Sequence, residues 1–158
     1  IEIIYFCMTN IGFYHLRRTP LEKALPQLLR KALESGKKVV VRAGSEERIN
    51  FLNLALWTTE PSSFLPHGSA KEGMAEKQPI WLTTGQDNPN KAKILISTDG
   101  VKSKDFRAFE RCLEIFDGRD QEAVDLARTR WNFYKEAGCT LTYWQQNDGG
   151  RWEKINDL

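Results

Sequence analysis

Residues 37–67 read KKVVVRAGSEERINFLNLALWTTEPSSFLPH. The valine run at 39–41 predicts a buried strand, the small residues at 43–45 predict a turn, and the apolar spacing over 49–56 predicts a helix. The remainder, 57–67, is a proline-bounded loop with two large aromatic residues. A strand followed by a turn and a helix is typical of α/β folds, which place nucleotide sites at such turns. The glycines that a phosphate would need are missing here.

The same alternation of strand and helix extends in both directions from this stretch. Strands are predicted at 11–16, 37–42, 79–84, 93–97, 111–116 and 139–146. Helices are predicted behind four N-cap residues, Thr19, Ser45, Ser103 and Asp120, and Gly36 is expected to end the first of them. This order predicts an α/β fold: a three-layer α/β/α Rossmann-like domain with a mainly parallel central sheet and no nucleotide-binding loop.

Length and patterning predict one domain with short appendages. A chain of 158 residues is the size of a single domain. Residues 1–7 are apolar but lack the basic start of a signal peptide, so we interpret them as an N-terminal extension outside the fold. Residues 8–154 form the expected domain and 155–158 a C-terminal tail. Residues 68–77 show no apolar periodicity and predict a mobile surface loop.

Composition restricts the classes of function. The formal net charge is +2, which is too small to indicate a nucleic-acid coat. No apolar run is long enough to span a bilayer. The three cysteines, Cys7, Cys112 and Cys139, have no paired spacing, which argues against a disulfide framework and suits a reducing, cytoplasmic compartment.

Most motifs that would indicate catalysis are absent or incomplete. The turn at 16–20 has no glycine, so Arg17 and Arg18 are a solvated basic turn more readily than a phosphate site. Ser45 lacks the frame of a nucleophile elbow and is interpreted as a helix cap. His15 lies in an apolar strand and is expected to be a core histidine.

No metal site and no cofactor are predicted. The cysteines and histidines are scattered along the chain, whereas metal ligands cluster. His67 follows a proline in a loop, where it would touch a partner or orient the loop.

Two groups of residues remain as candidate binding surfaces. The first comprises Trp57, Phe64, Leu65 and Pro66, which form either a loop folded onto the core or a contact surface. Two large aromatic residues around Pro61 and Pro66 favour recognition, because aromatic side chains dominate interface hot spots.

The second group lies on the last predicted helix. Arg128, Trp131 and Lys135 occur at helical spacing and share a face with Val124. An apolar patch edged by positive charge suits a short acidic peptide with an apolar end. The alternative places Trp131 in the core and Arg128 in solvent.

Short matches along the chain show a resemblance to a known family. They are GFYHL at 12–16, GKKVVV at 36–41, ALW at 55–57, SFLPH at 63–67, KILIS at 93–97, ARTRW at 127–131 and AG at 137–138. In order and spacing, the chain from Met8 to about Lys154 resembles the chi subunit of bacterial DNA polymerase III. The variants AGSEER at 43–48 and YWQQ at 143–146 look like those of alphaproteobacterial members.

The resemblance implies a non-catalytic accessory subunit of the clamp-loader assembly, which acts in DNA replication and contacts DNA only indirectly. It implies two partners: the acidic C-terminal tail of single-stranded DNA-binding protein, and a psi subunit or a helicase. The tail pocket would comprise Phe116, Val124, Arg128, Trp131 and Lys135, with Arg130 or Lys135 adding long-range attraction. The psi or helicase surface would comprise Trp57, Phe64, Pro66 and His67.

Departures from the family pattern concern the tail pocket. Val124 and Asn132 stand where better-studied relatives have lysine, and Trp131 stands where relatives have tyrosine. These changes imply a weaker positive field beside an unchanged aromatic wall. The alternative function is an enzyme or nucleotide-binding protein on a degenerate Rossmann-like fold. A direct nucleic-acid binder is a third possibility, disfavoured by the modest charge.

Overall fold

The computed structural model describes residues 7–58 and 65–156. Its strands are β1 (Asn10–Leu16), β2 (Val39–Arg42), β3 (Ile80–Thr83), β4 (Ile94–Ser97), β5 (Arg111–Asp117), β6 (Thr140–Gln146) and β7 (Trp152–Ile155). Its α-helices are α1 (Leu21–Glu34), α2 (Glu46–Thr58) and α3 (Gln121–Glu136), and two 3₁₀ turns are η1 (Ala75–Lys77) and η2 (Phe106–Ala108). The strands form a sheet in the order β3-β2-β4-β5-β1-β6-β7.

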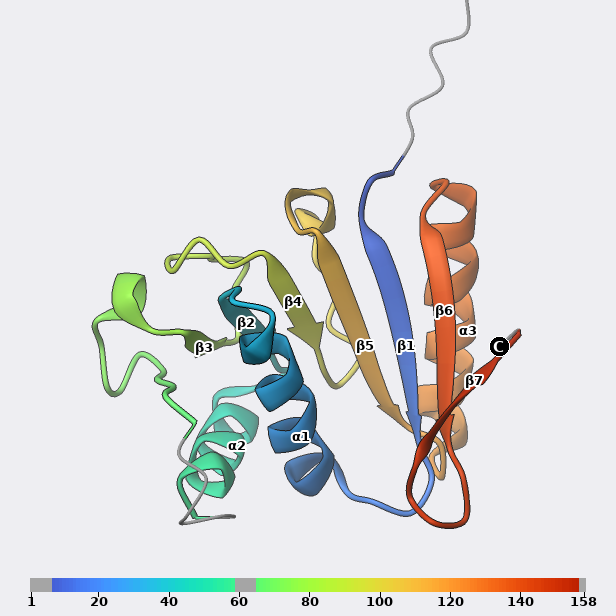
Figure 1. Cartoon of the computed structure of the whole chain (residues 1–158), viewed down its shortest axis with the longest axis horizontal. Helices are drawn as coiled ribbons and strands as arrows, with labels where there is room; N and C mark the ends of the chain where they lie inside the picture. Colours follow the sequence, from blue (N-terminus) through green and yellow to red (C-terminus); the bar gives the residue numbers. More distant parts are fainter. Residues whose placement is uncertain (1–6, 59–64, 157–158) are drawn as a thin grey trace, which may run out of the picture.

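The sheet is parallel except for β7, which pairs antiparallel with β6. The connection from β1 through α1 to β2 runs in one direction along the sheet, and that from β5 through α3 to β6 runs in the other. Because such crossovers are right-handed, the two helices fall on opposite faces. Figure 1 shows α1 and α2 on the near face and α3 behind β1 and β6. The three-layer, mainly parallel α/β/α prediction is confirmed.

Alternation along β1 divides the core between the two faces. Tyr14 and Leu16 pack with α1 and α2, whereas Ile11 and Phe13 pack with α3. Successive side chains of a strand point to opposite faces, so one strand contributes to both layers. Burial on both sides explains why the central strands read as continuous apolar runs.

Helix ends agree with the sequence at α2 and α3 and differ at α1 and η2. Ser45 Oγ accepts from the Arg48 N–H at 3.2 Å, and Asp120 caps α3 through the Glu122 N–H. The predictions of Thr19 and Ser103 as caps are wrong. Pro20 is the N-cap of α1 and its side chain makes no capping bond, and Asp105 precedes η2. The carboxylate of Asp105 instead pairs with the buried Arg42, so it is not available for a cap.

Residues 68–77, predicted as a mobile surface loop, are bonded to the sheet and to α2. Gly68 forms a β-bridge with Trp81, with its N–H donating to Ile80 O at 3.0 Å. Glu72 accepts from Asn53 Nδ2 at 2.6 Å and from the backbone N–H and hydroxyl of Ser69. Partial burial acts to raise the pKa of Glu72, but these hydrogen bonds outweigh it and hold the pKa at about 2. The polar composition thus reflects internal hydrogen bonding.

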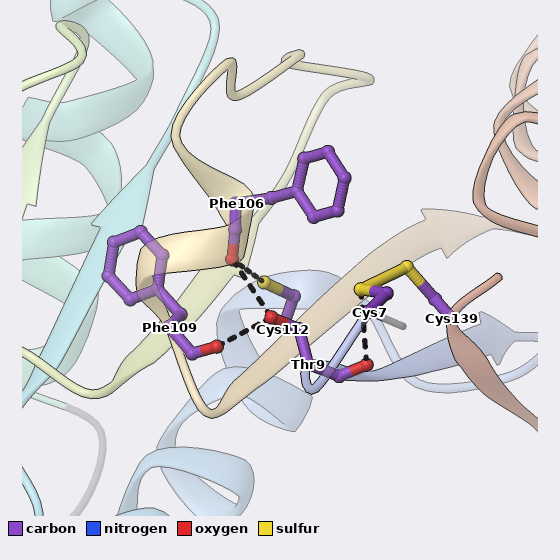
Figure 2. The surroundings of a disulfide bond; sticks show 6 residues. All are labelled: Cys7, Thr9, Phe106, Phe109, Cys112 and Cys139. Atoms are coloured by element: carbon purple, nitrogen blue, oxygen red, sulfur yellow. Dashed lines mark hydrogen bonds between the residues drawn. A yellow bond between two sulfur atoms is a disulfide. The ribbon is translucent and has the colours of Figure 1, made fainter. Parts of the chain in front are cut away.

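Two of the three cysteines are bonded to each other, contrary to the expectation of unpaired thiols. Cys7 and Cys139 form a disulfide, with their Cα atoms 4.8 Å apart (Figure 2). Parallel pairing of β1 with β6 sets Asn10 beside Thr140, so the residues that precede the two strands meet despite a separation of 132 residues. Cys112 is free and buried, and burial raises the pKa of its thiol.

Candidate functional site

The turn between β1 and α1, where folds of this type bind phosphate, is occupied by a side chain of the protein itself. The Oε1 atom of Gln146 accepts hydrogen bonds from the backbone N–H groups of Arg17, Arg18 and Thr19 at 3.1, 3.3 and 3.3 Å. Gln146 is buried, at the end of β6. Consecutive backbone N–H groups form the cradle that binds anions in phosphate loops. Here a neutral amide oxygen fills that cradle, which disfavours a phosphate at the same place.

The predicted tail pocket is brought together by the end of β5 and by α3. Phe116, Val124 and Trp131 belong to one apolar cluster and each is at most 9% exposed. The ring of Trp131 lies edge-on to Phe13, with centroids 5.3 Å apart. Arg128 and Lys135 are exposed on the same helix. This is the arrangement that the alternative interpretation expected, with Trp131 in the core and Arg128 in solvent, and it leaves as the candidate site a buried aromatic floor with an exposed basic edge.

Arg130 does not supply the long-range attraction expected of it. Its guanidinium is buried, donates to the Glu114 carboxylate and lies 3.2 Å from Tyr134 Oη. Burial acts against the charged form of Arg130, but the Glu114 charge outweighs it and raises the Arg130 pKa. This pair is matched in charge and lies beneath α3, so it offers no free positive charge to an acidic peptide.

A second polar pair, which the sequence did not indicate, lies next to the predicted pocket. His15 Nδ1 shares a hydrogen bond with Tyr143 Oη, and the His15 ring packs on Phe116 with centroids 4.9 Å apart. Burial lowers the His15 pKa, and the charge of Arg17 lowers it further. Burial raises the pKa of Tyr143, and the charges of Arg128 and Arg17 oppose that rise. Arg17 therefore shares the electrostatic environment of Arg128, although 111 positions separate them.

Gly118 makes room for this pair. A Cβ atom at Gly118 would overlap the imidazole of His15 and lie 2.7 Å from the carbonyl oxygen of Leu16. The Gly118 N–H donates to that same carbonyl at 2.7 Å. Close backbone approach, more than turn propensity, requires glycine at this position.

The other predicted surface is described in part. Trp57, in the last turn of α2, is 46% exposed and lies against His67, with ring centroids 4.4 Å apart. His67 is buried, and its Nδ1 is bonded to the Leu65 carbonyl. Pro66 is partly exposed, and Phe64 lies outside the described residues. The buried His67 ring therefore packs against the inner side of the half-exposed Trp57 ring. This position fits the expectation that His67 orients the loop better than the expectation that it touches a partner.

Helix α2 also exposes two apolar residues that the sequence did not single out. Phe51 and Leu54 are 44% and 63% exposed and precede Trp57 at intervals of three. This helix is apolar on two sides, because Ile49, Leu52 and Leu56 form its buried face. The sequence did carry a signal for this surface: a second row of apolar residues on α2, in addition to the row that fills the core.

Residues 7–58 and 65–156 were also compared with the requirements of a metal site and of a membrane-spanning helix. No group of three His, Cys, Asp or Glu side chains is placed to hold a metal ion. None of the helices described is long and apolar enough to cross a membrane.

The fold and the filled turn define the class of protein: a Rossmann-like α/β domain in which the usual phosphate position is closed by an internal glutamine. The family profile described as DNA polymerase III chi subunit, HolC, matches residues 8–142. The chain belongs to this family of DNA polymerase III subunits.

Named relatives agree with this assignment over most of their length. The probable DNA polymerase III subunit chi of Rickettsia prowazekii is 28% identical over 155 residues, covering 94% of this chain and 93% of the relative. The DNA polymerase III subunit chi of Escherichia coli is 26% identical over 142 residues, covering 85% and 96%. That of Pseudomonas aeruginosa is 26% identical over 138 residues, covering 85% and 94%.

Proposed function

We propose that this chain is a non-catalytic accessory subunit of the DNA polymerase III holoenzyme. It acts in the cytoplasm within the clamp-loader assembly and links that assembly to single-stranded DNA-binding protein during DNA replication. Family membership over residues 8–142 supports the subunit assignment. Occupation of the phosphate cradle by Gln146 disfavours the alternative of an enzyme or nucleotide-binding protein on the same fold.

The observation that carries the link is the exposed basic edge of α3 beside an aromatic floor. Arg128 lies on the solvent side of a cluster that contains Phe116, Val124 and Trp131. In the proposed complex Arg128 pairs with the terminal carboxylate of the tail, because a guanidinium binds a carboxylate through two parallel hydrogen bonds. The terminal aromatic ring packs on the apolar floor, and Lys135 attracts the acidic residues that precede it.

Arg17 and Tyr143 extend this site on the β1 side. Arg17 follows His15, the hydrogen-bond partner of Tyr143, by two residues, and the charges of Arg17 and Arg128 both act to lower the Tyr143 pKa. A second cation partly replaces the positive charge lost where Val124 stands for a lysine.

A separate surface on the other face of the sheet is proposed for the psi subunit or a helicase. It is centred on Trp57 and continues along α2 to Leu54. Exposed aromatic and aliphatic side chains on one helix form the apolar centre that stable protein interfaces require. Because α2 and α3 cover opposite faces, both partners can bind at once.

The test is titration of the C-terminal tail peptide of single-stranded DNA-binding protein into wild type and variants at two salt concentrations. Arg128→Ala is expected to cost about 2 kcal/mol or more, as for a charge pair in a partly dry site. Lys135→Ala is expected to cost under about 1 kcal/mol, and its effect should fade with salt. The same peptide with an amidated C-terminus should bind as weakly to wild type as the native peptide binds to Arg128→Ala.

Two control variants separate the site from general charge and from the second surface. Arg107→Ala removes an exposed arginine that stacks on Phe106 and is not one of the five pocket residues, and it should leave the affinity unchanged. Trp57→Ala should also leave tail binding unchanged while reducing recovery of the psi subunit or helicase in a pulldown. Wild-type affinity of Arg128→Ala for the tail would show that the proposed site is wrong.

A further inference from the structure

A crevice of about 610 Å³ lies at the edge of the sheet where α1 and α3 begin, the two helices that cover opposite faces. It is bordered by the carboxyl ends of β1, β4 and β5, the first turn of α1, and the facing parts of α2 and α3. In Figure 1 these strand ends point to the lower edge of the sheet. Parallel α/β sheets bind their ligands at such a switch point, in the crevice outside the carboxyl ends of the strands.

The charges that line this crevice are mostly negative. Six carboxylates border it, from Glu22, Asp99, Glu114, Asp117, Asp120 and Glu122. Three arginines, Arg48, Arg119 and Arg130, also border it, so the formal charge of the lining is 3 − 6 = −3. The whole chain carries +2, so the negative charge is local.

Each of the three arginines already has a carboxylate partner from the same lining. Arg48 Nε lies 3.4 Å from Asp99, and Arg119 Nε lies 3.0 Å from Asp117. Arg130 donates to Glu114. The charge left over comes from Glu22, Asp120 and Glu122.

Phosphates and other anions are poorly suited to this crevice. The N-terminal N–H groups of α3, which would otherwise receive an anion, have Asp120 as their cap and Glu122 in the first turn. Carboxylates at a helix N-terminus satisfy the donors and the helix dipole that a phosphate would use. The crevice therefore attracts cations at the position where related architectures attract phosphate.

Exposed apolar side chains stand at two sides of the same crevice. Phe51 of α2 and Leu126 of α3 are 44% and 48% exposed, and both line it. The guanidinium of Arg48 lies 5.4 Å from the centre of the Phe51 ring. Apolar contact and unpaired negative charge are thus presented together.

This crevice shares Phe116 with the proposed tail pocket and otherwise uses a different flank of α3. The lining includes Ala123, Leu126 and Arg130 from one flank of α3, and it excludes Arg128 and Lys135. At 100° per residue, Leu126 lies 160° from Arg128 around the helix axis. One helix therefore presents a basic flank to one side and the border of an acidic crevice to the other.

We propose that this crevice binds a segment of a partner protein in which an apolar side chain is flanked by lysine or arginine residues. The apolar side chain packs between Phe51 and Leu126, and the flanking cations meet Glu22 and Glu122. Opposite charge selects such a segment over the acidic tail, which the crevice repels. The subunit thereby holds an acidic peptide on one flank of α3 and a basic peptide on the other.

The test uses three synthetic peptides and the full chain, with binding followed by fluorescence anisotropy. The first probe has a central leucine between lysines, the second replaces each lysine with glutamate, and the third replaces the leucine with serine. The first probe should bind, and the second and third should bind at least about five-fold more weakly, because each lacks one of the two contacts.

Variants on α3 locate the binding. Glu122→Lys should weaken the first probe by about five-fold or more at low salt. Asp125→Lys makes the same change in charge on the same helix outside the crevice and should change the affinity less than about two-fold. Leu126→Ser, at a half-exposed position, should weaken binding of the leucine probe but not of the serine probe.

Three results would overturn the proposal. These are equal weakening by Glu122→Lys and Asp125→Lys, tighter binding of the glutamate peptide than of the lysine peptide, and displacement of the first probe by ATP. The first would mean diffuse attraction, and the others would mean an anion site.

Discussion

Truncation of Gln146 tests the idea that a side chain of the protein closes the phosphate turn. Gln146→Ala removes the acceptor of three backbone N–H groups, those of Arg17, Arg18 and Thr19. The N···Oε1 distances of 3.1 to 3.3 Å indicate ordinary to weak hydrogen bonds, and each stabilises the fold by about 0.5–1 kcal/mol net. Water reaches the exposed side of the turn and recovers part of this, so we expect a loss of about 2 kcal/mol.

Urea unfolding of wild type and variants would measure this loss, with a fall in Tm of about 4–8 °C as an independent readout. Gln145→Ala makes the same truncation one position earlier on β6 and should change stability by less than about 0.5 kcal/mol. Gln146→Glu supplies an oxygen acceptor of similar shape and should retain most of the stability above the pKa of its carboxyl group. Equal effects of Gln146→Ala and Gln145→Ala would refute the account of the turn.

Two further predictions concern stability. Gly118→Ala should cost about 1–3 kcal/mol in a denaturant titration, because its Cβ would displace His15. Gly149→Ala, whose Cβ would lie 3.4 Å from Asn147 Oδ1, should be nearly neutral, and similar values for both variants would contradict the close approach at Gly118. The folded pKa of Glu72, about 2, is below its ordinary value of 4.5, so its contribution should be complete above pH 4.5 and be lost as the pH falls toward 2. Because the carboxylate is exposed, that contribution is roughly 1 kcal/mol, and the pH dependence of unfolding should lack this component in Glu72→Gln.

Local signals predicted most of the secondary structure. The apolar runs at β2, β4 and β5 are strands, and Ser45, Asp120 and Gly36 mark helix ends as expected. These features depend on neighbours within a few residues, so the sequence carries them directly. The caps predicted at Thr19 and Ser103 failed because the helices begin later than expected: the N-cap positions are Pro20 and Asp105, one and two residues further along the chain.

The candidate tail site was predicted as a set of residues but not as a geometry. Helical spacing placed Val124, Arg128 and Trp131 on one side of the predicted helix; all three belong to α3, where Val124 and Trp131 are buried and Arg128 is exposed. Spacing cannot say which members of such a face are covered, because burial depends on the strand that packs against it. Trp131 is buried against Phe13. Arg130, which was named together with Lys135 for long-range attraction, is paired with Glu114 in the interior.

The sequence by itself determined the alternation of strand and helix, the helix ends at Ser45 and Asp120, and the absence of a glycine-rich turn after the first strand. Each of these is a property of a short segment. Only the tertiary structure decided what replaces the phosphate at that turn, which cysteines meet, and which apolar face of α2 remains exposed. Pairing of β1 with β6 brings His15 to Tyr143, the β1–α1 turn to Gln146, and Cys7 to Cys139. These contacts span more than 120 residues, so no local pattern encodes them.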